Sequence, residues 1–275
     1  MNDKTGFEAD ACVRDRQKGS RSGAMMHDLT MGTGSLISVE GLDGAGKSTI
    51  ITALQAEIDD AVILREPGGT AISELMREIL KGEQLSSQPV MMVDSTRAFI
   101  ERELPFVRAR SLREVLDQAM TGDRITISVT DEISAAEEVI LFNIARAELM
   151  SNKIVPALTA DKVVILDRFI DSTIAYQGYG RGLSPDSVRS ICLRATQGQV
   201  PDLTIYIRVS PQTAFSRING RGPADRIEAG GIEFFNRVAD GFEIIAAGES
   251  RIQVIDGEAP APEVAAAALA KLAEL

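Results

Sequence analysis

The sequence predicts an α/β fold, a doubly wound, five-stranded parallel sheet with helices on both faces. Five short and almost continuous apolar runs follow one another along the chain, as in strands that are buried on both faces of a parallel sheet. Most of the segments between these runs have the length and the apolar spacing of helices. Strands that alternate with helices in this way indicate a doubly wound domain.

The five predicted strands are apolar runs of four or five residues, at 36–39, 61–64, 163–166, 203–207 and 252–255. Their continuous apolar character is typical of strands of which neither face meets water. The predicted helices lie between and after them. They begin at Lys47, Ala71, Ala135, Pro185, Pro211 and Glu233, and a last, alanine-rich helix covers 262–273.

Residues 86–134 do not fit this alternation. Residues 94–120 have a helical pattern that Pro105 interrupts, since proline removes a helical hydrogen bond. Residues 125–129 alternate as a short strand would. A structureless loop of this length is uncommon inside a compact domain. We therefore predict a structured, partly helical insertion.

Residues 1–34 have no apolar periodicity and carry five acidic and five basic residues. We predict a disordered tail, followed by one domain that covers residues 35–275. The tail has no apolar segment of the kind that a secretory signal needs. Nowhere do about 18 apolar residues follow one another, the length that a membrane span requires. These features predict a cytoplasmic protein without a membrane partner.

The composition narrows the possible functions. The chain has 29 basic and 40 acidic residues, a net charge of −11, which makes it a poor candidate for binding nucleic acid. The negative net charge does not exclude a small anionic substrate, because a local cluster of arginines can dominate the electrostatic field in a cleft. The single histidine, His27, lies in the predicted tail, which removes most histidine-dependent chemistry. Two cysteines cannot form a disulfide framework.

Residues 41–48 match the pattern G-x-x-x-x-G-K-[ST] between the first predicted strand and the first predicted helix, where this pattern forms a phosphate-binding loop (P-loop). The glycines let backbone N–H groups converge on phosphate oxygens, and the helix N-terminus adds the positive end of its dipole. Lys47 would reach the β- and γ-phosphates, and the Ser48 hydroxyl would bind Mg²⁺. The sequence thus predicts a P-loop NTPase fold. The residues predicted to hold the nucleotide are Gly41, Leu42, Asp43, Gly44, Ala45, Gly46, Lys47, Ser48 and Thr49.

Asp167 and Arg168 end the third predicted strand. An aspartate at this end of a strand, beside the P-loop, is well placed to assist the metal ion or its waters; the alternative is that it caps the following segment. Arg168 is a bidentate phosphate donor at the same crevice. The polar, aromatic and glycine-rich residues 171–182 suggest a loop that contacts a flat polar ligand, or else a plain surface loop.

Several motifs together resemble the thymidylate kinase family. They are EGLDGAGKST at 40–49, REPGGT at 65–70, DRFIDSTIAYQGYGRG at 167–182, PDLTIY at 201–206 and RGPADRIE at 221–228. They run in the family's order from about Ser35 to the C-terminus, with residues 86–134 unmatched. One departure is Phe169, where the family usually has Tyr or His, so that a ring is kept and a hydroxyl is lost.

The resemblance implies a kinase that uses ATP and Mg²⁺ to phosphorylate thymidine monophosphate (dTMP) to the diphosphate, in dTTP synthesis. It also implies a homodimer. Two alternatives remain: a kinase for another deoxynucleoside monophosphate, and a nucleotide-binding regulatory protein on the same fold. The acidic chain has only 4% aromatic residues, which makes a nucleic-acid-dependent ATPase a weaker candidate.

The resemblance also implies a role for each acceptor-site residue. Asp43 would hold the sugar 3′-hydroxyl, Arg65 and the Pro67 turn would shape the monophosphate pocket, and Arg168 would bind the acceptor phosphate. Arg146 would face the base. The other residues implied to line the base and deoxyribose are Thr173, Tyr176 and Gln177. Among these, the Tyr176 ring would crowd the 2′ position and favour deoxyribose.

Residues 216–228 are predicted to form a mobile lid. Phosphoryl transfer depends mainly on positioning and on neutralising the charge of the moving group, and Arg217, Arg221 and Arg226 lie in a Gly- and Pro-containing stretch between two predicted helices. The alternative is a solvated charged loop. In this family, a P-loop without arginine goes with a lid that supplies the catalytic arginine. The predicted catalytic residues are Lys47, Asp167, Arg168, Arg217, Arg221 and Arg226, and the predicted metal ligands are Ser48 and Asp167.

Overall fold

The computed structural model describes residues 34–83, 85, 90–126, 128–219 and 230–274. The predicted disordered tail, apart from residue 34, lies outside the described residues. So does most of the predicted lid, including Arg221 and Arg226. Among the described helices, none is long and apolar enough to cross a membrane.

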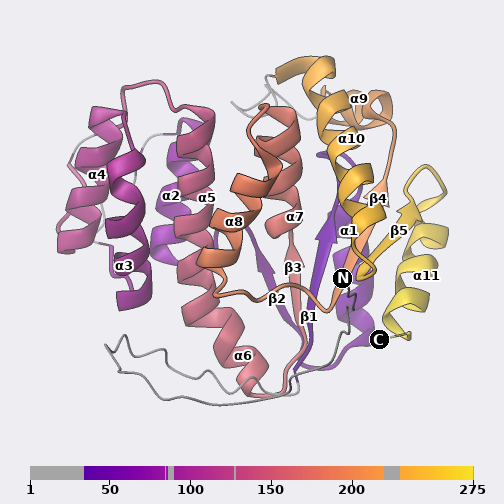
Figure 1. The fold of residues 1–275 in the computed structure, drawn as a ribbon. Coiled ribbons are helices and arrows are strands. Elements are labelled where there is room, and N and C mark those ends of the chain that lie inside the picture. The colour runs from indigo at the N-terminus through magenta and orange to yellow at the C-terminus, as the bar shows by residue number, and fades with distance from the viewer. Residues whose placement is uncertain (1–33, 84, 86–89, 127, 220–229, 275) are drawn as a thin grey trace, which may run out of the picture. The chain divides into compact units, whose positions relative to one another are not determined.

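One parallel sheet organises the described chain (Figure 1). Its strands are β1 (Leu36–Glu40), β2 (Val62–Arg65), β3 (Val164–Asp167), β4 (Leu203–Arg208) and β5 (Ile252–Asp256), in the order β2-β3-β1-β4-β5. All five predicted strands are confirmed, and the predicted α/β fold with them. β1 lies between β3 and β4, so strands that come later in the chain lie on both sides of it, and a crevice is expected at its carboxyl end, where ligands bind in such sheets.

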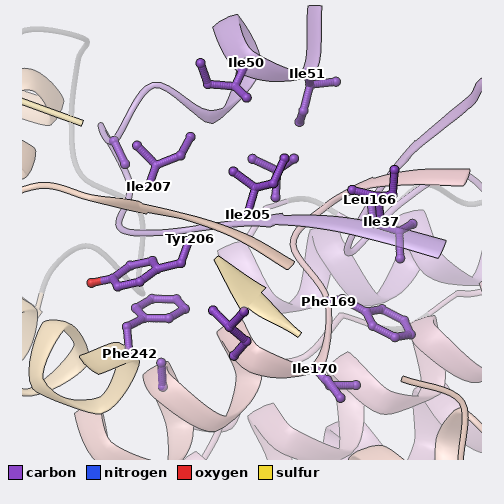
Figure 2. Close-up of a cluster of buried hydrophobic side chains, with 14 of the residues drawn as sticks. Ile37, Ile50, Ile51, Leu166, Phe169, Ile170, Ile205, Tyr206, Ile207 and Phe242 are labelled. Carbon is purple, nitrogen blue, oxygen red and sulfur yellow. The ribbon is translucent and has the colours of Figure 1, made fainter. Parts of the chain in front are cut away.

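Helices cover both faces of this sheet. Their bounds are α1 (Lys47–Glu57), α2 (Ala71–Lys81), α5 (Ala135–Leu149), α6 (Val155–Thr159), α7 (Ile170–Thr173), α8 (Pro185–Ala195), α9 (Pro211–Asn219), α10 (Gly231–Gly248) and α11 (Ala261–Leu272), with π-helical segments η2 (Met150–Ile154) and η3 (Ile174–Gly180). Each predicted helix is confirmed, with its start within two residues. Figure 2 shows Ile50 and Ile51 of α1 on one side of β1 and β4, and Tyr206 stacked on Phe242 of α10 on the other.

Residues 86–134 are structured and partly helical where they are described. Helix α3 (Asp94–Glu103) and helix α4 (Arg110–Thr121) are joined by the 3₁₀ turn η1 (Leu104–Phe106), so that Pro105 interrupts the helical pattern as predicted. We call residues 94–121 the α3–α4 hairpin. Its helix α3 packs on α5, and the hairpin shares with α5 and α2 a second apolar cluster, separate from the one on the sheet (Figure 1).

Two local predictions are wrong. The described residues of 125–129 form no strand, because the Thr126 N–H bonds the side chain of Gln118 instead of a neighbouring strand. Residues 171–182 form no loop but continue as α7 and η3, almost entirely buried. The glycines that suggested a loop serve close packing here. A Cβ at position 180 would lie 2.6 Å from the ring of Phe234.

Candidate active site at the carboxyl end of the sheet

The P-loop joins β1 to α1 in the geometry that its sequence predicts. Gly46 precedes α1 with φ +94°, and Gly44 has φ +83°, a left-handed conformation that favours glycine. A Cβ on Gly44 would also lie 2.6 Å from the carbonyl oxygen of Ala214 in α9. The loop is thus held against α9. Arg217, at the end of that helix, donates from Nη1 to the Gly44 carbonyl at 3.1 Å.

Lys47 is folded back onto its own loop. Its Nζ donates to the carbonyl oxygens of Leu42 at 3.0 Å and of Gly41 at 3.3 Å. Burial, aided by the charge of Arg168, lowers the pKa of the Lys47 ammonium to about 8. An anion beside Nζ would favour the charged form of the amine.

A cavity of about 350 Å³ opens between the P-loop, β2, β3, α2, α5, α7 and η3, within the size range of small-ligand sites. It brings together most of the residues that the sequence singled out. Those lining it are Asp43, Gly44, Gly46, Lys47, Ser48, Thr49, Arg65, Pro67, Arg146, Asp167, Arg168, Thr173, Tyr176 and Gln177. Three predicted P-loop residues do not line it: Gly41, Leu42 and Ala45 are buried. Arg217 does not line it either and meets the loop from α9.

Arg168 lies at the centre of the crevice, in a left-handed backbone conformation with φ +71°. A non-glycine residue in this region is uncommon and is found at functional sites. Its guanidinium pairs with Asp43 and donates to the Gly41 carbonyl at 3.0 Å and to the Ser172 hydroxyl at 2.9 Å. It also lies 5.0 Å from the centre of the Tyr176 ring.

Glu40, the last residue of β1, fixes the chain just after Arg168. Its carboxylate is completely buried and accepts hydrogen bonds from the Phe169 N–H at 2.8 Å and from the Ser172 hydroxyl. Burial, and then the charge of Asp171, raises the pKa of Glu40 to about 7. The sequence motif contained Glu40 without revealing this contact.

Asp43 and Tyr176 both line the cavity and bond each other. The Tyr176 hydroxyl donates to Asp43 Oδ2 at 2.9 Å and accepts from the Asp43 N–H at 3.1 Å. Burial raises the pKa of Asp43, but the charges of Arg168 and Lys47, with the Tyr176 hydrogen bond, outweigh it and lower the pKa to about 2. Asp43 is therefore a firmly ionised acceptor at neutral pH.

Arg146 is buried, with 1% of its surface exposed, in an ion pair that the sequence did not reveal. Glu66 Oε2 accepts from Nε and Nη2 of Arg146 at 2.9 and 2.7 Å, and the Thr173 hydroxyl accepts from Nη2 at 2.9 Å. The ring of Phe169 lies 5.3 Å from the guanidinium, so the residue that departs from the family pattern keeps a ring contact. Burial raises the pKa of Glu66 against the charge of Arg146.

Arg65 and Pro67 end β2 and begin the turn toward α2. Arg65 is largely exposed and pairs with Glu74 of α2 at 3.1 Å, and the Pro67 carbonyl accepts from Arg77 at 3.2 Å. Gln177 donates from Nε2 to Glu138 of α5 at 3.1 Å.

Some residues that line the cavity were not predicted as site residues from the sequence. They are Glu66, Arg77, Leu80, Lys81, Phe142, Phe169 and Ser172. The helical spacing of some of these residues could have indicated that they lie beside the predicted site. Arg77, Leu80 and Lys81 are three and four positions apart and share one face of α2, and Phe142 precedes Arg146 by one turn of α5.

Ser48 and Asp167 are the candidate metal ligands, and both line the cavity. Asp167 is the last residue of β3 and pairs in register with Val39 of β1, the strand that precedes the P-loop. Its Oδ1 is buried and has no hydrogen-bond partner in the described part of the chain. A hydroxyl and an unpartnered carboxylate oxygen fit a hard cation such as Mg²⁺ that keeps several waters. The described residues contain no group of three or more His, Cys, Asp or Glu side chains that would hold a metal alone.

The parallel sheet, its strand order and the loop between β1 and α1 define a class, the P-loop nucleotide-binding proteins. Comparison with known proteins gives the family. The family model for thymidylate kinase matches residues 39–100 and 108–268, and the chain belongs to the thymidylate kinase family. This match includes most of residues 86–134, which the sequence motifs had left unmatched.

Individual relatives agree with the family model. Over 235 residues the chain is 36% identical to the thymidylate kinase of Chlorobium phaeobacteroides, a match that covers 80% of this chain and 86% of that protein. It is 34% identical over 229 residues to that of Caldanaerobacter subterraneus subsp. tengcongensis, covering 82% and 88%. The thymidylate kinase of Carboxydothermus hydrogenoformans is 32% identical, covering 84% and 93%.

Proposed function

We propose that the protein transfers the γ-phosphate of ATP to dTMP and so makes dTDP for dTTP synthesis. Family membership supports the activity. The single observation that carries the proposal is the cavity itself. It holds the P-loop lysine, Lys47, together with a separate set around Arg168, Asp43 and Tyr176, as a transfer between two bound phosphates requires.

The donor nucleotide would lie on the P-loop, over residues 41–49. Lys47 would leave the Leu42 and Gly41 carbonyls and bind the β- and γ-phosphates, and the N-terminus of α1 would add its dipole. Because the P-loop is packed against α9, Arg217 is close to the phosphates from the other side. This supports Arg217, in the last turn of α9, as one arginine that acts on the transferred group; the predicted Arg221 and Arg226 lie outside the described residues.

The acceptor nucleotide would lie on the α2 and α5 side. Arg168 would bind its phosphate, and Arg65 and the Pro67 turn would border that pocket. Asp43, held ionised, would accept a hydrogen bond from the sugar 3′-hydroxyl, while the Tyr176 ring would crowd the 2′ position.

The base would lie over the side chains of α5, α7 and η3. Thr173 and Gln177 would present hydrogen-bonding atoms to its edge, and Arg146 would face the base. Phe142, one turn before Arg146, lines the cavity and offers a flat apolar surface. Most polar atoms of Arg146 are already satisfied by Glu66, Asn143 and Thr173, so this arginine would be held in one orientation before the base binds.

Mg²⁺ would be held by Ser48 and, directly or through water, by Asp167, together with phosphate oxygens. When bound, the ion neutralises charge on the β- and γ-phosphates. The acceptor phosphate needs no side-chain base, because its oxygen is already a competent nucleophile at neutral pH. The protein contributes alignment and charge: Lys47 on the donor, Arg168 on the acceptor, and arginines of the lid on the group in transit.

A panel of nucleoside monophosphates tests the acceptor. With saturating ATP and Mg²⁺, coupled ADP release is expected with dTMP and much less with dCMP, dGMP or thymidine ribonucleotide. Faster turnover of dUMP or another deoxynucleotide than of dTMP would assign a different acceptor. No turnover of any of them, with ATP still bound, would identify a regulatory nucleotide-binding protein.

We also propose that the protein is a cytoplasmic homodimer, as the family resemblance implies. Sedimentation equilibrium at micromolar concentration measures this directly. A mass of one chain, 29.5 kDa, at all concentrations would contradict it.

A further inference from the structure

The two helices of the α3–α4 hairpin have no N-terminal cap of their own. Val93 precedes α3 and Ala109 precedes α4, and neither side chain bonds its helix. Carboxylates from outside the hairpin take this place: Asp131, just before α5, accepts from the Ser111 N–H of α4 at 2.7 Å, and two glutamates of α5 bond the residues that precede the helices. Glu148 Oε2 accepts from the Val93 N–H at 3.2 Å, and Glu137 Oε1 accepts from the Ala109 N–H at 2.7 Å and from the Arg108 N–H at 2.8 Å. A carboxylate at a helix N-terminus satisfies a free N–H and meets the positive end of the dipole.

These two glutamates lie near opposite ends of α5, at its third and fourteenth residues. The hairpin is therefore held on α5 at both ends, and apolar side chains fill the space between. Figure 1 shows α3 and α4 beside α5, on the side away from the sheet. The α5 residues on this face are Glu137, Leu141, Ile144 and Glu148, at helical spacing.

A different face of α5 carries the acceptor-site residues. Glu138, Phe142 and Arg146 are four positions apart, so they form one stripe along the helix. Phe142 and Arg146 line the cavity, and Glu138 accepts from Gln177, which also lines it. Each capping glutamate thus lies one or two residues from a member of this stripe.

All the charges on both faces are buried. Glu137, Glu138 and Glu148 are each 2% exposed. Buried carboxylates need fixed partners, and losing one leaves a costly unsatisfied group. A shift of α5 would break the contacts on both faces, so the position of the hairpin and that of the cavity stripe are mechanically linked.

We propose that the α3–α4 hairpin is a positioning element for the acceptor nucleotide: through Glu137 and Glu148 it fixes the rotation and the axial position of α5, and thereby the place of Arg146 and of the Glu138–Gln177 pair. The inference rests on the proposed function only for the identity of the acceptor. Glu137 and Glu148 are positioning residues and touch no substrate.

The test removes one backbone donor from each end of the hairpin and leaves α5 unaltered; the Arg108 N–H, also bonded to Glu137, is kept. Val93 has φ −80° and Ala109 has φ −61°, values that proline adopts, so Val93→Pro and Ala109→Pro each delete one N–H with little backbone strain. Glu114→Ala is the matched control, since Glu114 pairs with Arg110 on the exposed side of α4.

The expected result is a split between the two substrates. Each proline variant raises KM for dTMP about threefold to tenfold, as loss of part of a charge-assisted hydrogen bond would, while KM for ATP stays within about twofold. Hydrogen exchange of the α5 amides becomes faster in the same variants. Glu114→Ala changes none of these quantities.

Unchanged KM for dTMP, with a lower melting temperature, would overturn the proposal and leave the hairpin a purely structural cover. If a proline variant does not fold, the same measurements of KM for dTMP, KM for ATP and α5 hydrogen exchange are made on Glu148→Gln. Failure of the proposed function is recognised separately, because the unaltered protein then does not phosphorylate dTMP. In that case KM is measured for the nucleotide that the protein does accept. If it accepts none, hydrogen exchange of the α5 amides alone tests the inference.

Discussion

The hydroxyl group of Tyr176 donates to Oδ2 of Asp43 at 2.9 Å, which connects a carboxylate of the P-loop to a side chain of the segment after β3. The same Tyr176 ring lies beside the guanidinium of Arg168. One tyrosine thus holds two charged groups that we assign to the acceptor nucleotide. Its ring and its hydroxyl act on different parts of that ligand and can be separated by substitution.

Tyr176→Phe keeps the ring and removes the donor to Asp43. We expect kcat/KM for dTMP to fall roughly 10- to 100-fold, since hydrogen bonds to charged groups contribute about 1.5–3 kcal/mol. The preference for deoxyribose should remain, because the ring still crowds the 2′ position. Tyr206→Phe is the control: Tyr206 is also buried and bonds Glu243, but lies outside the cavity. Steady-state kinetics with dTMP and its ribonucleotide measure both effects.

Lys47→Ala tests the donor end. Loss of the ammonium group should lower kcat by roughly 10²- to 10³-fold, as loss of one preorganised donor to a charged transition state does, while the fold is retained. The exposed Lys162→Ala serves as the control for charge. Undiminished turnover in Lys47→Ala would mean that the P-loop does not act on the transferred phosphate.

The sequence predicts well what is encoded locally. The five strands are continuous apolar runs, and the P-loop and the Asp167-Arg168 pair follow strands directly. Because the carboxyl ends of parallel strands meet at one edge, these residues were expected to gather there, and Lys47, Asp167 and Arg168 do line one cavity.

Contacts between distant residues could not be predicted in this way. Glu66 and Arg146 are 80 positions apart, and no local pattern pairs them. The π-helical course of η3 was missed because Gly178 and Gly180 indicate a loop unless the neighbouring helices are known. The capping of α4 by Glu137 was missed for the same reason: nothing before α4 shows that its cap comes from another helix.

The buried ion pair of Glu66 and Arg146 gives a prediction on stability. Arg146→Met leaves a carboxylate buried without its partner, which should lower the free energy of unfolding by about 3–5 kcal/mol. Adding Glu66→Gln to that variant removes the unpaired charge and should recover part of the loss. Urea denaturation of the two single variants and the double variant measures the coupling. Additive effects would show that the two side chains do not stabilise each other.

The raised pKa of Glu40 predicts how the free energy of unfolding depends on pH. Burial, with the charge of Asp171, raises its pKa from the ordinary 4.5 to about 7, against the opposing charge of Arg168. Between these values the folded protein binds a proton that the unfolded chain does not. Stability from this group is therefore fully present below about pH 4.5 and is lost as pH rises through about 7, by on the order of 3 kcal/mol in total.

Glu40→Gln removes this titration and keeps an oxygen that can accept from Phe169. The free energy of unfolding of the unaltered protein, minus that of Glu40→Gln, should therefore fall steadily between pH 5 and pH 8, as measured by urea denaturation at each pH. The same substitution at the exposed Glu101 controls for the amide itself. A difference that does not change over this range would contradict the raised pKa, and one that grows with pH would show that Glu40 is stabilised in its charged form by Arg168.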